Sequence, residues 1–157
     1  MTPEQRLKEL GLEMPVGIAP YANYVPYVRE GSLLFIAGQA PAAGGALRYV
    51  GRVGADLTEQ DGYASARLCA LNALAQVAAA VGSLGRVRQV VSLRGFVNSA
   101  NDFYNQALVV NGASDLLVAV FGERGRHARA ALGTSVLPMN MATEVELVVA
   151  VDDSLPS

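Results

Sequence analysis

The sequence predicts a single-domain α+β protein of the split β-α-β type, with two helices on one face of a mixed sheet. Three observations lead to this fold class. Residue patterns follow the order strand, strand, helix, strand, helix, strand, strand. Both helical segments carry apolar residues at helical spacing, which need a sheet to pack on. The length of 157 residues is typical of one domain with its own core.

Two helices have clear start and stop signals. Residues 2–12 predict a short helix, because Thr2 suits the N-cap, a proline follows it, and Gly11 suits the stop. Thr58 is a second N-cap candidate, and the acidic residues after it favour a helix N-terminus. Small and apolar residues then recur at helical spacing as far as Gly82, the expected C-cap.

Strands are expected on both sides of a glycine-containing turn near the N-terminus. Residues 23–29 predict a first strand, residues 30–31 a tight hairpin turn, and residues 33–38 a second strand. The second strand is apolar on both sides, which indicates a central position. Glycines at 44–45 and 51–54 predict turns in a long loop.

The segment 86–98 predicts a long strand with two different faces. Val87, Val91, Leu93 and Val97 are expected to face the helix, and the reverse face would carry Arg88, Val90, Ser92, Arg94, Phe96 and Asn98. A half-polar face with arginines fits a subunit interface, with solvent exposure as the alternative. A second helical region follows over residues 101–122, with an expected interruption at Asn111–Gly112.

The C-terminal segment predicts two strands joined by a proline-containing turn. Arg129 shares its strand face with small residues, namely Ala131, Gly133 and Ser135. Glu144 and Glu146 lie opposite an apolar face of the last strand, so we expect Arg129 and both glutamates on one side of the sheet. A guanidinium in a small-residue hollow suits a carboxylate ligand. A surface ion pair is the alternative interpretation.

Several spaced motifs resemble the RidA family, also called YjgF/YER057c/UK114. They are Asn23-Tyr24, the run Gly31 to Pro41, Gly95 to Asn98 before Asn101-Asp102-Phe103, Ala128-Arg129-Ala130, Leu137-Pro138 and Glu144-Val145-Glu146. The resemblance covers about residues 20–152 and implies a chorismate-mutase-like sandwich that forms a homotrimer with sheets inward. We assign residues 1–19 as an N-terminal extension and residues 20–153 as the RidA-like domain.

The resemblance also implies a reaction at clefts between subunits. It is hydrolysis of reactive enamines or imines, of the 2-aminoacrylate type, to a 2-keto acid and ammonia, without a cofactor. Arg129 stands where the family binds the substrate carboxylate, and Glu144 where it orients water or relays a proton. Substrate-binding positions are matched by Tyr24, Gly38, Asn111 and Ala131.

Ala131 and His127 both lie within two residues of Arg129. Many members of the family carry a cysteine where this chain has Ala131, so any role of that thiol is lost. His127 could be a second titrating group, and a solvated loop histidine is the favoured interpretation.

Composition excludes several classes of protein. The net charge of −2 argues against a sequence-independent nucleic-acid binder. Cys69 is expected to be a core residue, and a single histidine with no ligand cluster argues against a metal site. The apolar runs are short for a membrane span, and the N-terminus lacks a signal-peptide pattern, so a cytoplasmic location is expected.

Three function classes stay open from the sequence. The first is an imine or enamine deaminase acting on a small carboxylate metabolite. The second is a non-catalytic trimer that binds such a metabolite at the same cleft and regulates a partner. The third is an endoribonuclease, against which one histidine, one lysine and an acidic balance count.

Overall fold

The computed structural model describes residues 1–15, 22–152 and 154, and it has the α+β fold that the sequence predicts. Five strands form one sheet in the order β1, β2, β7, β5, β6, in which only β5 and β6 run parallel. The strands are β1 (Tyr27–Glu30), β2 (Leu33–Gln39), β5 (Val87–Asn98), β6 (Ala128–Thr134) and β7 (Thr143–Val151). A separate small ribbon contains β3 (Ala42–Ala43) and β4 (Ala46–Leu47).

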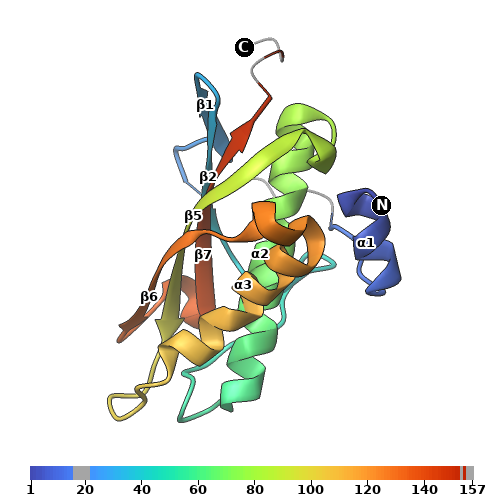
Figure 1. Cartoon of the computed structure of the whole chain (residues 1–157). Helices are drawn as coiled ribbons and strands as arrows, with labels where there is room; N and C mark the ends of the chain where they lie inside the picture. Colours follow the sequence, from blue (N-terminus) through green and yellow to red (C-terminus); the bar gives the residue numbers. More distant parts are fainter. Residues whose placement is uncertain (16–21, 153, 155–157) are drawn as a thin grey trace.

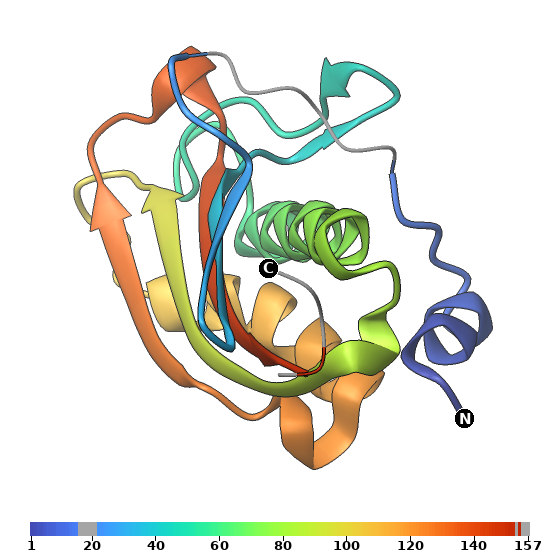
Figure 2. The same ribbon diagram turned by 90° about the horizontal axis from the view of Figure 1, so that it is seen from above.

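Two long helices cover one face of the sheet and leave the other face bare (Figures 1 and 2). They are α2 (Glu59–Val81) and α3 (Gln106–Phe121). Short 3-10 turns connect the elements: η1 (Leu84–Arg86), η2 (Gly122–Gly125) and η3 (Pro138–Asn140). The main core lies between the helices and the sheet, where valine and leucine side chains are buried.

The N-terminal helix α1 (Pro3–Glu9) begins where the sequence places it. The Thr2 side chain accepts a hydrogen bond from the backbone N–H of Gln5 in a capping box. Leu7 is buried in the main core, and the Glu4 carboxylate accepts from the Leu84 backbone N–H at 2.7 Å. The assigned domain limits at residues 19–20 and 153 lie outside the described residues and stay a prediction.

Helix α2 is capped as expected. The Thr58 hydroxyl accepts from the Asp61 N–H, and Gly82 ends the helix with φ +84°. Among the described residues α2 is the one helix long and apolar enough to cross a bilayer, and 67% of that window is buried within the protein. The burial is that of a core helix.

Helix α3 is continuous, so the interruption expected at Asn111–Gly112 is wrong. Gly112 serves close packing of two helices instead. A Cβ atom on Gly112 would overlap the Tyr63 carbonyl oxygen on α2. The glycine therefore marks a helix crossing, which has the same sequence signature as a helix break.

The first hairpin differs in detail from its prediction. Strand β1 begins at Tyr27, after Pro26, which cannot donate to a neighbouring strand. Its partner register pairs Glu30 with Leu33, so the turn residues are Gly31 and Ser32. Gly31 has φ +60°, the conformation that such a turn requires.

The orientation of two residues in β5 was predicted wrongly. Val90 is fully buried toward the helices, and Val91 is exposed on the bare face. Register shifts on both sides of Val90 in its pairing with β7 are the cause, because an extra residue in a strand reverses the alternation after it. Asn98, expected on the outer face, is buried at the strand end, where its amide donates to the Met141 carbonyl.

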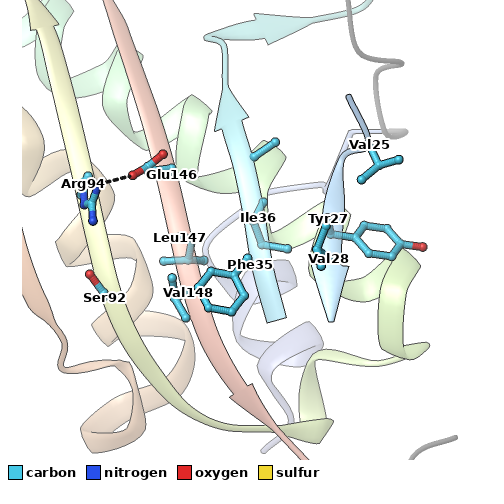
Figure 3. Close-up of a pocket in the computed structure, with 11 residues that line it drawn as sticks. Val25, Tyr27, Val28, Phe35, Ile36, Ser92, Arg94, Glu146, Leu147 and Val148 are labelled. Atoms are coloured by element: carbon cyan, nitrogen blue, oxygen red, sulfur yellow. Dashed lines mark ion pairs between the residues drawn. The ribbon is translucent and has the colours of Figure 1, made fainter. Parts of the chain in front are cut away.

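Apolar side chains surround an ion pair on the bare face of the sheet. Arg94 and Glu146 form that pair at 3.2 Å (Figure 3). Around it, four apolar side chains keep 37% to 53% of their surface exposed: Val28, Phe35, Val91 and Leu132. A shallow pocket of about 380 Å³ lies over this face. Such a patch is typical of a surface that another protein covers.

Candidate functional site

The predicted site residues separate into two groups within the chain. Asn111 and Arg129 lie together where β6 meets α3. Tyr24, Gly38 and Glu144 line a groove beside β2 and β7. We call the first group, with Ser114, the arginine cluster, and the second the glutamate groove.

Arg129 faces the helices, so the expectation that it shares a sheet face with Glu144 and Glu146 is wrong. Strand β5 lies between β6 and β7, and the parallel register pairs Arg129 with the buried Leu93. Glu144 pairs with Phe96 of β5, so its side chain lies on the opposite, bare face of the sheet. The prediction failed because it placed the core side of β6 at Ala130 and Leu132, which lie on the bare face.

The arginine cluster fixes the Arg129 guanidinium by hydrogen bonds. Its Nη1 donates to Asn111 Oδ1 at 2.7 Å and to Ser114 Oγ at 3.2 Å, and Nη2 donates to the Ala107 carbonyl at 3.3 Å. These three acceptors lie on one stripe of α3, at positions i, i+4 and i+7. Of the five N–H groups of an arginine, two remain without a partner among the described residues. Two such donors match the two oxygens of a carboxylate.

Ala131 lies two residues after Arg129 on the same face of β6. It is partly buried and packs against the main core. Its strand partner is Gly95, whose missing side chain leaves room for Val110 of α3. Small residues at both positions let α3 come close enough for its side chains to reach Arg129.

The glutamate groove is large and mostly apolar, with a volume of about 930 Å³. Gly38 is required beside Glu144, because a Cβ atom there would overlap the Glu144 carboxylate. Tyr24 is half exposed on the groove wall. The remaining lining includes Val25, Pro26, Gln39, Pro138, Met139 and Met141.

The environment of Glu144 favours its protonated form. Partial burial is the main cause that raises the pKa of the Glu144 carboxyl, and the charge of Glu146 adds to it. A carboxyl group with a raised pKa can exchange a proton closer to neutral pH. The groove therefore holds a side chain suited to general acid or base chemistry.

Cys69 is the core residue that the sequence predicts. Burial, as the main cause, raises the pKa of its thiol to about 12, and its sulfur lies 3.3 Å from the Thr143 hydroxyl. A thiol in this state is not a nucleophile at neutral pH. Among the residues that the structure describes, no group of three potential ligand side chains could hold a metal ion.

The sequence interpretation missed Ser114 and underrated His127. His127 is partly buried and both ring nitrogens have partners, so it is not the solvated loop histidine that was favoured. The spacing Asn111-x-x-Ser114 places the two side chains one helical turn apart, and this is the sequence signal that could have identified Ser114.

The chain resembles one protein family along nearly its whole length. Residues 4–151 match the model of YjgF/chorismate-mutase-like proteins, whose description adds a candidate endoribonuclease activity. Protein TCP17 of Trypanosoma cruzi is 47% identical over 150 residues, which cover 94% of this chain and 92% of that protein.

Solved structures show the same fold at two levels of similarity. Atu1372 of Agrobacterium tumefaciens, a protein of unknown function, has a TM-score of 0.91 at 47% identity, covering 96% of this chain and 92% of that one. A candidate endoribonuclease from Shewanella oneidensis has a TM-score of 0.94 at 42% sequence identity, and the match covers 96% of this chain and 100% of that one. E. coli TdcF with bound serine has a TM-score of 0.58 at 26% sequence identity, and the match covers 88% of this chain and 93% of that one.

Proposed function

This chain belongs to the YjgF/chorismate-mutase-like family, and we propose that it hydrolyses small imines and enamines of the 2-aminoacrylate type to 2-keto acids and ammonia. The observation that carries the proposal is the Arg129 guanidinium, which is fixed by three acceptors on α3 and keeps two N–H groups for a carboxylate. A 2-imino acid carries such a carboxylate next to its reactive carbon.

The reaction needs few groups once the substrate is held. An enamine such as 2-aminoacrylate first tautomerises to the imine by moving a proton from nitrogen to carbon. Water then adds to the imine carbon, a C–O bond forms, and the nitrogen gains a proton. Collapse of this carbinolamine breaks the C–N bond and releases ammonia and the keto acid. Glu144 is suited to take the proton from water and return it to nitrogen.

Both halves of the site come together only if a second copy of the chain supplies one of them. Within one chain Arg129 and Glu144 lie on opposite faces of the sheet. We therefore place the reaction in a homotrimer with sheets inward, where the arginine cluster of one subunit meets the glutamate groove of its neighbour. The apolar bare face supports this arrangement, since it needs a partner.

A second candidate function is binding without catalysis. The similarity to E. coli TdcF, determined with bound serine, favours a small amino acid or carboxylate as ligand. Such a trimer would use Arg129 in the same way and report metabolite levels to a partner. An endoribonuclease, the activity suggested for several relatives, has less support because the chain has a net charge of −2.

The discriminating experiment follows the decay of an imine made in the reaction vessel. A dehydratase generates 2-aminoacrylate from serine, or an amino-acid oxidase generates longer imines, and semicarbazide traps what remains. The wild type should accelerate the decay, and Arg129→Ala should lose this acceleration. Arg126→Ala is the matched control, because Arg126 is an exposed arginine that pairs with Glu123 at 3.1 Å.

Binding is measured in parallel by titrating a 2-keto acid into each variant. Removing the charge-assisted contacts should weaken binding by about 30- to 150-fold, which corresponds to about 2–3 kcal/mol. Keto-acid binding without acceleration of any imine would favour the binding function. Normal turnover by Arg129→Ala would refute the proposed site.

A further inference from the structure

We propose that Ser114 and His127 are positioning residues that hold the Arg129 guanidinium in its carboxylate-binding orientation. This inference rests on the proposed function, since it concerns the same arginine. It adds to that site a histidine that acts on Arg129 through a serine.

The three residues form one chain of hydrogen bonds. His127 Nδ1 lies 2.6 Å from the Gly125 carbonyl oxygen, which can only accept, so Nδ1 carries a hydrogen. His127 Nε2 lies 2.9 Å from Ser114 Oγ. In the neutral imidazole Nε2 is an acceptor, so the Ser114 hydroxyl donates to it.

The direction of this donation decides what Ser114 can do for Arg129. With its hydrogen directed to His127, the Ser114 oxygen presents its lone pairs to other donors. Arg129 Nη1 donates to this oxygen at 3.2 Å. Each bond polarises the next in the same direction, from arginine to serine to histidine to carbonyl. His127 thereby fixes the rotation of the serine hydroxyl, and the serine fixes the guanidinium.

Ser114 and His127 come from separate elements of the fold. Ser114 lies in the middle of α3, and His127 lies between η2 and β6. A mid-helix serine often bonds to the carbonyl four residues earlier, which would leave it unable to donate elsewhere. Here its partner is the histidine, and the contact ties α3 to the strand that carries Arg129.

The test compares ligands with and without the negative charge that Arg129 should bind. Binding of 2-oxobutanoate and of its neutral amide is measured by calorimetry on the full chain. Ser114→Ala and His127→Ala should each weaken binding of the carboxylate by about three- to tenfold, the effect of one hydrogen bond, and leave the amide unchanged. The double variant should lose no more than either single one, because both act through one contact.

His127→Gln provides a conservative rescue. The glutamine side chain can place an oxygen near the position of Nε2 and accept from Ser114, so carboxylate binding should return toward the wild-type value. Arg126→Gln is the matched control, since this neighbour of His127 is exposed and pairs only with Glu123 among the described residues. It should bind both ligands as the wild type does.

Several results would overturn the inference. Equal weakening of carboxylate and amide would indicate a general structural defect, and so would additive effects in the double variant. Unchanged carboxylate binding in His127→Ala, while Arg129→Ala loses it, would reject the inference and leave the proposed function intact.

A measurement without ligand separates the two proposals further. The Nε–H signal of Arg129 in ¹⁵N spectra reports whether the guanidinium is fixed. In the wild type we expect this signal to be sharp and to lie at a different chemical shift from the signals of solvent-exposed arginines. In Ser114→Ala it should broaden and move toward the shift of those exposed arginines. A mobile Arg129 in the wild type would reject the positioning role, and failure of keto-acid binding with a fixed Arg129 would reject the proposed function.

Discussion

Arg129 and Glu144 lie on opposite faces of the same sheet, with β5 between their strands. The parallel pairing of Arg129 with Leu93 directs the arginine toward α3, and the antiparallel pairing of Glu144 with Phe96 directs the glutamate toward the groove. Two residues that a single substrate would need thus belong to two half-sites. If the proposed reaction uses both residues, it depends on the assembly of at least two copies of the chain.

Gly38→Ala should impair the site without unfolding the protein. The added Cβ atom would overlap the end of the Glu144 side chain, which is flexible and can move aside. We expect the melting temperature to change little, while imine turnover falls by about tenfold or more because the carboxylate is displaced. Gly85→Ala is the control, since its Cβ would meet only Ser83 Oγ at 3.3 Å. Unchanged turnover in Gly38→Ala would argue against a role for Glu144.

Glu144→Gln should stabilise the fold at neutral pH. Burial, with a smaller contribution from Glu146, raises the pKa of Glu144 above its ordinary value of 4.5. Between 4.5 and that raised pKa the folded state binds more protons than the unfolded state, so the free energy of unfolding falls as pH rises. Glutamine removes this loss. Denaturant unfolding at pH 7 should therefore favour the variant, with the difference disappearing below about pH 4.5.

Glu123→Gln is the control for this pH series, because Glu123 is exposed and forms an ion pair with Arg126 on the surface. Its stability should follow the wild type across the same range. A wild-type curve that does not fall between pH 4.5 and 7 relative to Glu144→Gln would contradict the raised pKa.

Phe35→Glu should disrupt the proposed trimer. Phe35 lies on the bare face near the Arg94–Glu146 pair, where a new carboxylate would be buried without a partner (Figure 3). Light scattering at micromolar concentration should show a trimer for the wild type and mostly monomer for the variant, with loss of imine turnover. Leu10→Glu, an exposed apolar position at the end of α1, should stay trimeric. A wild-type monomer would reject the interface.

Gly112→Ala should destabilise the fold strongly. Its Cβ would meet the backbone carbonyl of Tyr63, which cannot move without shifting α2. We expect a loss of about 1–3 kcal/mol or more, as for other overpacked sites. Gly62→Ala is a graded comparison, because the atoms nearest to a Cβ at that helical glycine belong to the side chains of Val109 and Val53, at 3.0–3.1 Å. A melting temperature of Gly112→Ala equal to that of the wild type would mean that α2 and α3 are not closely packed.

Features encoded by neighbouring residues were predicted correctly. The caps at Thr2, Thr58 and Gly82 depend on hydrogen bonds within a few residues, so the sequence contains the whole interaction. The order of strands and helices, and the alternation of Glu144 and Glu146 against an apolar face, follow from local periodicity. The family motifs also pointed to Arg129, Glu144, Tyr24, Gly38 and Asn111 as candidate site residues, but not to Ser114.

Features that depend on distant partners were not predictable in the same way. The reversed orientation of Val90 and Val91 results from register shifts against β7, and the face of Arg129 results from its pairing with Leu93, 36 residues earlier in the chain. The sequence by itself determined which elements form and which chemical groups are present. Only the tertiary structure decided which side of the sheet each group faces and which side chains meet, because strand register is set by contacts between segments far apart in sequence.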